Sequence, residues 1–150
     1  MYIFEIMHPC TRKEEDKIVE LIRQMELSGI TLLYDTYGAA IYGMISRLVD
    51  SEIIAEQILS DTLIRVCNHI IDFRPEHSTF FTWIMNIVRS LAKDHIFATI
   101  KNLEDKEDIS VFDLMVNKGF SIAVVSELLS IGKSACAMKL RAELMTINIK

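Results

Sequence analysis

Residues 53–71 read IIAEQILSDTLIRVCNHII, and this stretch decides how the rest of the chain is interpreted. Apolar residues recur in it at spacings of three and four, which predicts one core helix running from about Glu52 to Ile71. Its expected buried stripe consists of Ala55, Ile58, Leu59, Leu63, Val66, Cys67 and Ile70.

The opposite face of this predicted helix is polar. It carries Glu56, Gln57, Ser60, Asp61, Ile64, Arg65 and Asn68 in consecutive three-and-four rows. Most polar helix faces are only solvated, and periodicity alone favours that interpretation here. Ile64 is the exception, because an apolar residue among charged ones is typical of a protein-binding surface with a small hydrophobic anchor and a charged rim.

The segments before this helix predict two more helices. The first opens at Thr11, which has the spacing of a capping box with Glu14, and is expected to end near Ser28 and Gly29. The second spans about Thr31 to Val49. The expected buried residues are Ile18, Leu21, Ile22 and Met25 in the first, and Leu33, Tyr37, Ile41, Ile45 and Leu48 in the second.

A polar loop at 72–79, which contains Pro75, precedes a fourth predicted helix from Thr79 to Ile100. Short helices are expected at 109–117, 121–129 and 134–146, and the last two have the arrangement of a helix-turn-helix. The predicted fold is therefore all-α, with a four-helix bundle at 1–100, a short linker at 101–108 and a three-helix helix-turn-helix domain at 109–150.

Composition limits the function classes. The net charge is -5, which argues against coating nucleic acid by charge alone, so any DNA contact must be local. The three cysteines are widely spaced and fit reduced thiols, and no targeting segment or long apolar run is present. We therefore expect a cytoplasmic protein without membrane insertion, metal or cofactor, and no residue pattern supports an enzyme.

Two further segments carry side chains suited to DNA. The loop at 72–79 and the helix start after it combine Arg74 and His77 with aromatic residues such as Phe81, which could stack on unpaired bases or belong to the core. Near the end, Lys133, Lys139 and Arg141 could grip phosphates, although a basic face of this kind fits a solvated helix equally well.

Read together, 32–38 (LLYDTYG), 55–66 (AEQILSDTLIRV) and 80–84 (FFTWI), with Ile87, Arg89 and Asp94, resemble the extracytoplasmic-function group of sigma factors. The resemblance continues in 119–123 (GFSIA) and 127–129 (ELL). It implies that the first four helices bind core RNA polymerase and open the -10 promoter element, and that the last three read the -35 element. An anti-sigma factor is a further implied partner.

By the resemblance, Glu56 and Asp61 fall on acidic positions that face polymerase, and Arg89 and Lys139 fall on basic positions that contact promoter DNA. Together with the polar helix face, the expected polymerase-binding set is Glu56, Gln57, Ser60, Asp61, Ile64 and Arg65. Together with the loop and the basic segment, the expected promoter-DNA set is Arg74, His77, Phe81, Arg89, Lys93, Lys133, Ser134, Lys139 and Arg141.

The departures from the family concentrate in the DNA contacts. Ser60 stands where the family usually has Gln, Ser90 where Asn is usual, and Ala137 where Lys is usual. The leading interpretation is a sigma-like initiation factor. The alternatives are a degenerate sigma-like protein that binds polymerase or an anti-sigma partner without recognising a promoter, and an ordinary helix-turn-helix repressor.

Overall fold

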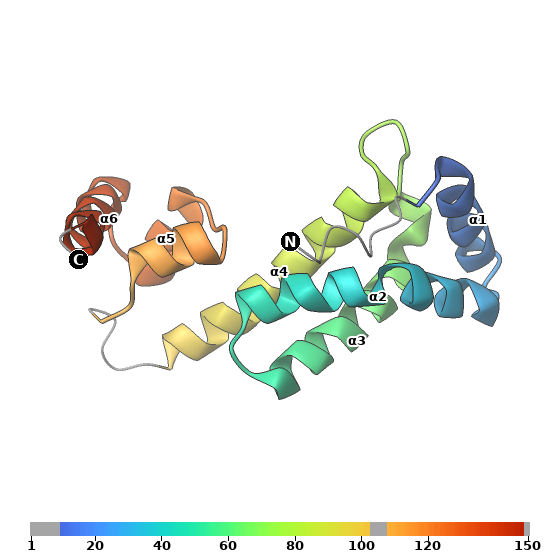
Figure 1. Ribbon diagram of the computed structural model, residues 1–150, viewed down its shortest axis with the longest axis horizontal. Helices are drawn as coiled ribbons and strands as arrows, with labels where there is room; N and C mark the ends of the chain where they lie inside the picture. Colours follow the sequence, from blue (N-terminus) through green and yellow to red (C-terminus); the bar gives the residue numbers. More distant parts are fainter. Residues whose placement is uncertain (1–9, 103–107, 149–150) are drawn as a thin grey trace. The chain divides into compact units, whose positions relative to one another are not determined.

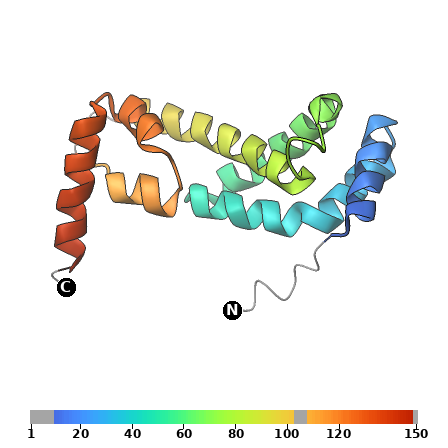
Figure 2. The same cartoon turned by 90° about the horizontal axis from the view of Figure 1, so that it is seen from above.

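The computed structural model describes residues 10–102 and 108–148 of the chain, and the regular structure within these ranges is entirely helical (Figures 1 and 2). The all-α prediction is therefore confirmed. In order, the elements are α1 (Arg12–Arg23), α2 (Leu27–Leu48), α3 (Glu52–His69), the 3-10 turn η1 (Ile70–Asp72), α4 (Phe80–Lys101), the π-helical turn η2 (Asp113–Asn117), α5 (Ile122–Leu129) and α6 (Lys133–Asn148).

The capping box at the start of α1 is confirmed. The Thr11 amide donates to the Glu14 carboxylate at 2.8 Å, and the Glu14 amide donates to the Thr11 hydroxyl at 3.3 Å. The predicted helix end near Ser28 and Gly29 is wrong, because α1 ends at Arg23 and both residues belong to α2. The chain reverses instead at Met25, which adopts a left-handed φ of 59° and is 93% exposed rather than buried.

Gly29 explains why the corner between α1 and α2 is so tight. A Cβ at this position would lie 2.8 Å from the backbone nitrogen of Ile22 and 2.9 Å from Cβ of Leu21. Such distances are below any normal contact, so only glycine lets α2 approach α1 this closely. The glycine that resembles a helix stop in the sequence is therefore a packing residue inside the next helix.

The stripe predicted for the second helix is confirmed, since Leu33, Tyr37, Ile41, Ile45 and Leu48 are all buried in α2. The stripe on α3 is narrower than predicted. It keeps Ala55, Ile58 and Val66 and adds Thr62, whereas Leu59, Leu63 and Cys67 are only half-buried. The Thr62 hydroxyl donates to the Ile58 carbonyl at 2.7 Å, which satisfies this polar group inside the core.

Aromatic rings pack together where the connection after α3 meets the start of α4. The loop predicted at 72–79 is present after η1, but Phe73 within it is 4% exposed. Its ring centroid lies 5.2 Å from that of Phe80 and 5.4 Å from that of Trp83. Phe73 therefore packs against the start of α4 and belongs to the core.

The chain separates into two compact units, Met1–Ala92 and Lys93–Lys150. The core of the second unit consists of Ile100, Val111, Leu114, Phe120, Val125, Leu128, Leu129 and Cys136. Most of the predicted linker, residues 103–107, lies outside the described residues, so the division into domains at 100 and 109 stays a prediction.

The second unit has the helix-turn-helix elements expected from the sequence. Ser121 caps α5, and Ser130, with a left-handed φ of 56°, ends it. The turn is fixed by the Ser126 hydroxyl, which donates to the Ile131 carbonyl. Across the described ranges, no helix combines the length and the apolar character needed to cross a membrane.

Candidate functional site

Exposed apolar residues lie along α3 and in η1. Ile53 is 79% exposed, Ile64 is 55% exposed and Ile71 is 71% exposed, with the exposed Gln57 and Ser60 between the first two. We call these five residues the outer seam. Spacings of four, three and four residues keep the seam from Ile53 to Ile64 on one side of α3, and Ile71 follows in the 3-10 turn η1.

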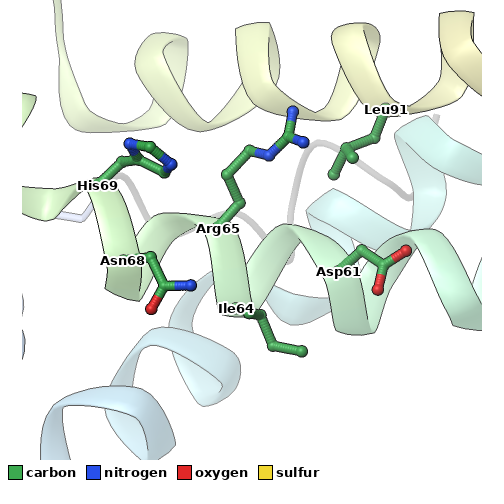
Figure 3. Close-up of a pocket in the computed structure, with 6 residues that line it drawn as sticks. All are labelled: Asp61, Ile64, Arg65, Asn68, His69 and Leu91. Atoms are coloured by element: carbon green, nitrogen blue, oxygen red, sulfur yellow. The ribbon is translucent and has the colours of Figure 1, made fainter.

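A shallow pocket lies beside the outer seam. It is open, has a volume of about 350 Å³ and is lined by Asp61, Ile64, Arg65, Asn68 and His69 of α3 together with Leu91 of α4. Figure 3 shows Arg65 and Leu91 pointing into the space between the two helices, whereas Ile64 points away from α4. Ile64 belongs both to the outer seam and to the pocket lining, so the polar face predicted for this helix continues from the seam into the pocket with Asp61 and Arg65.

The acidic side chains next to the seam are available to a partner. Glu56 is exposed and Asp61 is half-buried. Within the described residues neither carboxylate makes a hydrogen bond or ion pair. Near this surface, Nδ1 of His69 lies 3.2 Å from Oδ2 of Asp72, and both side chains are solvent-exposed. A carboxylate without a partner beside exposed isoleucines matches a hydrophobic anchor with an acidic rim.

The loop after η1 holds Arg74 and His77, both exposed. The Arg74 guanidinium donates to the carbonyl of Ile71 at 2.6 Å and to that of Phe73 at 3.2 Å. Arg74 therefore satisfies the backbone at the end of η1, and a DNA contact would have to share this side chain. The His77 amide donates to the Arg74 carbonyl at 3.0 Å, and the His77 side chain is exposed.

On α4 the residues predicted to contact DNA differ in their surroundings. Arg89 is exposed, whereas Phe81 is half-buried and its ring stacks on Tyr37 with centroids 5.8 Å apart. Lys93 places its ammonium 5.1 Å from the centroid of the Phe97 ring. Of these three side chains, Arg89 is the most exposed to solvent. Phe81 packs against Tyr37, so at least part of its ring belongs to the packing of the first unit.

In the second unit, α6 carries the remaining predicted DNA residues. Lys133, Ser134 and Arg141 are exposed, whereas Lys139 is half-buried. The carboxylate of Glu143 is turned inward and accepts the backbone N–H groups of Val111 at 3.1 Å and Phe112 at 2.7 Å. In the sequence, Glu143 is a single acidic residue among several basic ones. Nothing in its spacing predicts the contact with Val111 and Phe112.

The cysteine thiols and the Tyr37 hydroxyl are partly or fully buried, and burial raises their pKa values. Burial raises the pKa of the Cys10, Cys67 and Cys136 thiols, which keeps them protonated, and all three are free. Burial, and then a hydrogen bond with Cys10, raises the pKa of Tyr37, whose hydroxyl donates to Glu15 at 2.8 Å. In the described ranges, no group of three acidic, histidine or cysteine side chains is arranged to hold a metal.

A family model matches the middle of the chain. Residues 33–99, which contain all of α3 and most of α2 and α4, match the family model for sigma-70 region 2. This segment of the chain is therefore similar to sigma-70 region 2. The outer seam and the residues that line the pocket lie within the matched segment.

Two curated relatives belong to the group that the motifs of this chain resemble. The chain is 27% identical over 99 residues to the ECF RNA polymerase sigma factor BldN of Streptomyces coelicolor, a match covering 64% of this chain and 38% of BldN. It is 26% identical over 97 residues to the RNA polymerase sigma-H factor of Pseudomonas aeruginosa, covering 65% and 50% of the two chains. The resemblance to extracytoplasmic-function sigma factors is confirmed, and the matches span half or less of the length of these relatives.

A solved structure supports the fold. The structure of CnrH in complex with the cytosolic domain of CnrY contains a chain that matches with a TM-score of 0.50 at 17% sequence identity. The match covers 89% of this chain and 96% of that one. The similarity therefore extends beyond region 2 to most of the helical chain.

Proposed function

We propose that this chain binds core RNA polymerase through the outer seam of α3 and its acidic rim, and acts as a sigma-type transcription initiation factor. The observation that carries the proposal is Ile64, 55% exposed within the segment that matches sigma-70 region 2. Leaving so much apolar surface in water is unfavourable, and a partner that buries it gains about 25 cal/mol per Å².

The form of the seam suggests what the partner presents. Ile53 and Ile64 lie on one side of α3, so one side of a partner helix can contact both of them. Glu56 and Asp61 beside them favour lysine or arginine on that helix. The assigned contact residues are Glu56, Gln57, Ser60, Asp61, Ile64 and Arg65, to which the seam adds Ile53 and Ile71.

Promoter recognition is the second part of the proposal. Arg89 on α4, with Arg74 and His77 in the loop, supplies positive charge for the -10 element, and Lys133, Ser134 and Arg141 on α6 supply contacts to the -35 element. Phe81, Lys93 and Lys139 belong to the same proposed DNA set, but each is already engaged by its neighbours. The DNA contacts are therefore expected to be fewer than the full assigned set.

A protein partner that restrains the factor is also proposed. The matched structure is that of CnrH in complex with the cytosolic domain of another protein, CnrY, and this chain has the same fold. An anti-sigma factor that competes with polymerase for the outer seam would bury the same isoleucines. Competition between such a partner and core polymerase in a pull-down is the expected behaviour.

Run-off transcription with purified core polymerase and a broad promoter library tests the proposal. Specific transcripts that require the chain support initiation, and Glu56→Lys should reduce them by lowering polymerase occupancy. Polymerase binding without any transcript would instead support the degenerate sigma-like protein. That alternative rests on Ala135, Ala137 and Met138, exposed on α6 where side chains that read bases are expected.

A further inference from the structure

Two arginine side chains from distant parts of the chain donate to one backbone carbonyl at the base of the loop at 72–79. The guanidinium of Arg23, the last residue of α1, donates to the Phe73 carbonyl at 3.3 Å across 50 residues of sequence. The Arg74 guanidinium donates to the same oxygen at 3.2 Å. A carbonyl oxygen has two lone pairs, so the Phe73 carbonyl keeps one hydrogen bond when either arginine leaves it.

The two carbonyls that Arg74 contacts differ in their exposure to water. The bond to the Ile71 carbonyl is exposed, and Ile71 itself is 71% exposed, so water can replace Arg74 there. The bond to the Phe73 carbonyl is half-buried, and Phe73 is 4% exposed. A buried carbonyl that loses its donor is unfavourable. Phe73 is therefore the residue that needs a second donor when Arg74 turns away.

The backbone that carries Arg23 is held in place independently of the loop. Its neighbour Ile22 is 4% exposed, and the close approach at Gly29 fixes the end of α1 against α2. The Met25 amide also donates to the Ile22 carbonyl at 2.9 Å. Arg23 thus donates from a fixed helix end, whereas Arg74 belongs to the loop that it stabilises. When Arg74 leaves, the hydrogen bond from Arg23 still ties the loop to α1.

The charge of Arg74 is available to an anion. Arg74 is exposed, and among the described residues it makes no ion pair with a carboxylate. The proposed function brings DNA phosphate to this loop, so the inference rests on the proposed contact with the -10 element. We propose that Arg23 is a positioning residue for that contact. By holding the Phe73 carbonyl, it keeps the loop in place while Arg74 moves to a DNA phosphate.

A double-mutant cycle in the full chain tests whether Arg23 acts through Arg74. The probe is a fluorescently labelled single strand of DNA of degenerate sequence, about 16 nucleotides long, because phosphate contacts do not depend on sequence. Anisotropy titrations at several salt concentrations give the affinity and its salt dependence. The variants are Arg74→Ala, Arg23→Ala, the two combined, and Arg23→Lys, which retains a donor for the carbonyl. Arg12→Ala is the matched control, since it removes the same charge from an exposed position at the other end of α1.

Arg74→Ala should weaken binding about 5-fold and lower the slope of log affinity against log salt by about 0.7, the value for one phosphate of a single strand. Arg23→Ala should have a similar effect on both quantities, because Arg74 then stays on the Phe73 carbonyl. Adding Arg74→Ala to Arg23→Ala should weaken binding by less than about 2-fold more. Arg23→Lys and Arg12→Ala should both bind within about 2-fold of wild type.

The outcomes separate this inference from the proposed function. If wild type does not bind the strand, or if Arg74→Ala binds as wild type does, the proposed DNA contact of the loop is wrong and the inference is rejected with it. If Arg74→Ala weakens binding equally with Arg23 present and absent, or if Arg23→Ala, shown to be folded by its circular dichroism melt, binds as wild type does, the inference alone is rejected. An Arg12→Ala effect as large as that of Arg23→Ala would make the effect one of net charge and would also reject it.

Discussion

The backbone nitrogen of Phe112 lies 2.7 Å from Oε2 of Glu143, although 31 residues separate the two in the sequence. The same carboxylate accepts the Val111 amide and the Ser110 hydroxyl. A single side chain of α6 thus satisfies the free N–H groups at the start of the helical segment that contains η2, as a capping residue does within one helix.

Glu143→Ala should open the second unit locally. Two backbone N–H groups lose a charged acceptor, and hydrogen bonds to charged groups contribute about 1 to 3 kcal/mol each. Amide hydrogen exchange at Val111 and Phe112 should accelerate about 10-fold or more. Glu127→Ala, an exposed acid on α5, is the control and should leave exchange at these amides unchanged.

Two glycines of α2 should respond oppositely to alanine. Gly29→Ala forces a Cβ to within 2.8 Å of the Ile22 backbone and should destabilise the first unit by about 1 to 3 kcal/mol. Gly43→Ala meets nothing within 4 Å and should stabilise the same helix by about 0.5 to 1 kcal/mol. Urea unfolding measures both, and equal effects would show that the α1–α2 corner is looser than described.

The capping box should make stability depend on acid pH. Hydrogen bonds from the Thr11 amide and then its hydroxyl lower the pKa of Glu14 below its ordinary value of 4.5. The ionised form is thus favoured by folding, and its contribution is present above pH 4.5 and lost as the pH falls through the lowered pKa. Glu14→Gln should lower the melting temperature at neutral pH, and the difference from wild type should shrink in acid.

Asp16→Asn removes the same charge from an exposed position of α1 and serves as the control. A difference between Glu14→Gln and wild type that stays constant from neutral pH to about pH 3 would contradict the role of the ionised carboxylate.

The sequence predicted what depends on local patterns. The Thr11 cap and the whole buried stripe of α2 follow from spacing and are present in the structure. Ile64 was correctly singled out as exposed. These features depend on helical periodicity and capping chemistry, which act over a few residues.

What could not be predicted depends on distant neighbours. The left-handed turn occurs at Met25, a residue type that does not predict such a turn as glycine or asparagine would. Gly29 is required because the backbone of Ile22 lies too close for a Cβ atom. Glu143 shows its role only when η2 and α6 are packed together. Periodicity predicts a core helix from Glu52 to Ile71 but does not indicate where its neighbouring helices stop covering it, so the exposure of Ile53 and Ile71 could not be predicted.

The central claim is that the outer seam and its acidic rim bind core RNA polymerase. The affinity of the purified chain for core polymerase tests it most directly, measured for wild type and for Ile64→Glu, Asp61→Arg and the α1 control Asp16→Arg. Each α3 substitution should weaken binding about 10-fold or more, at least about 1.4 kcal/mol, and the control should bind as wild type does. Absence of binding by the wild-type chain, or unchanged affinity in both α3 variants, would contradict the account.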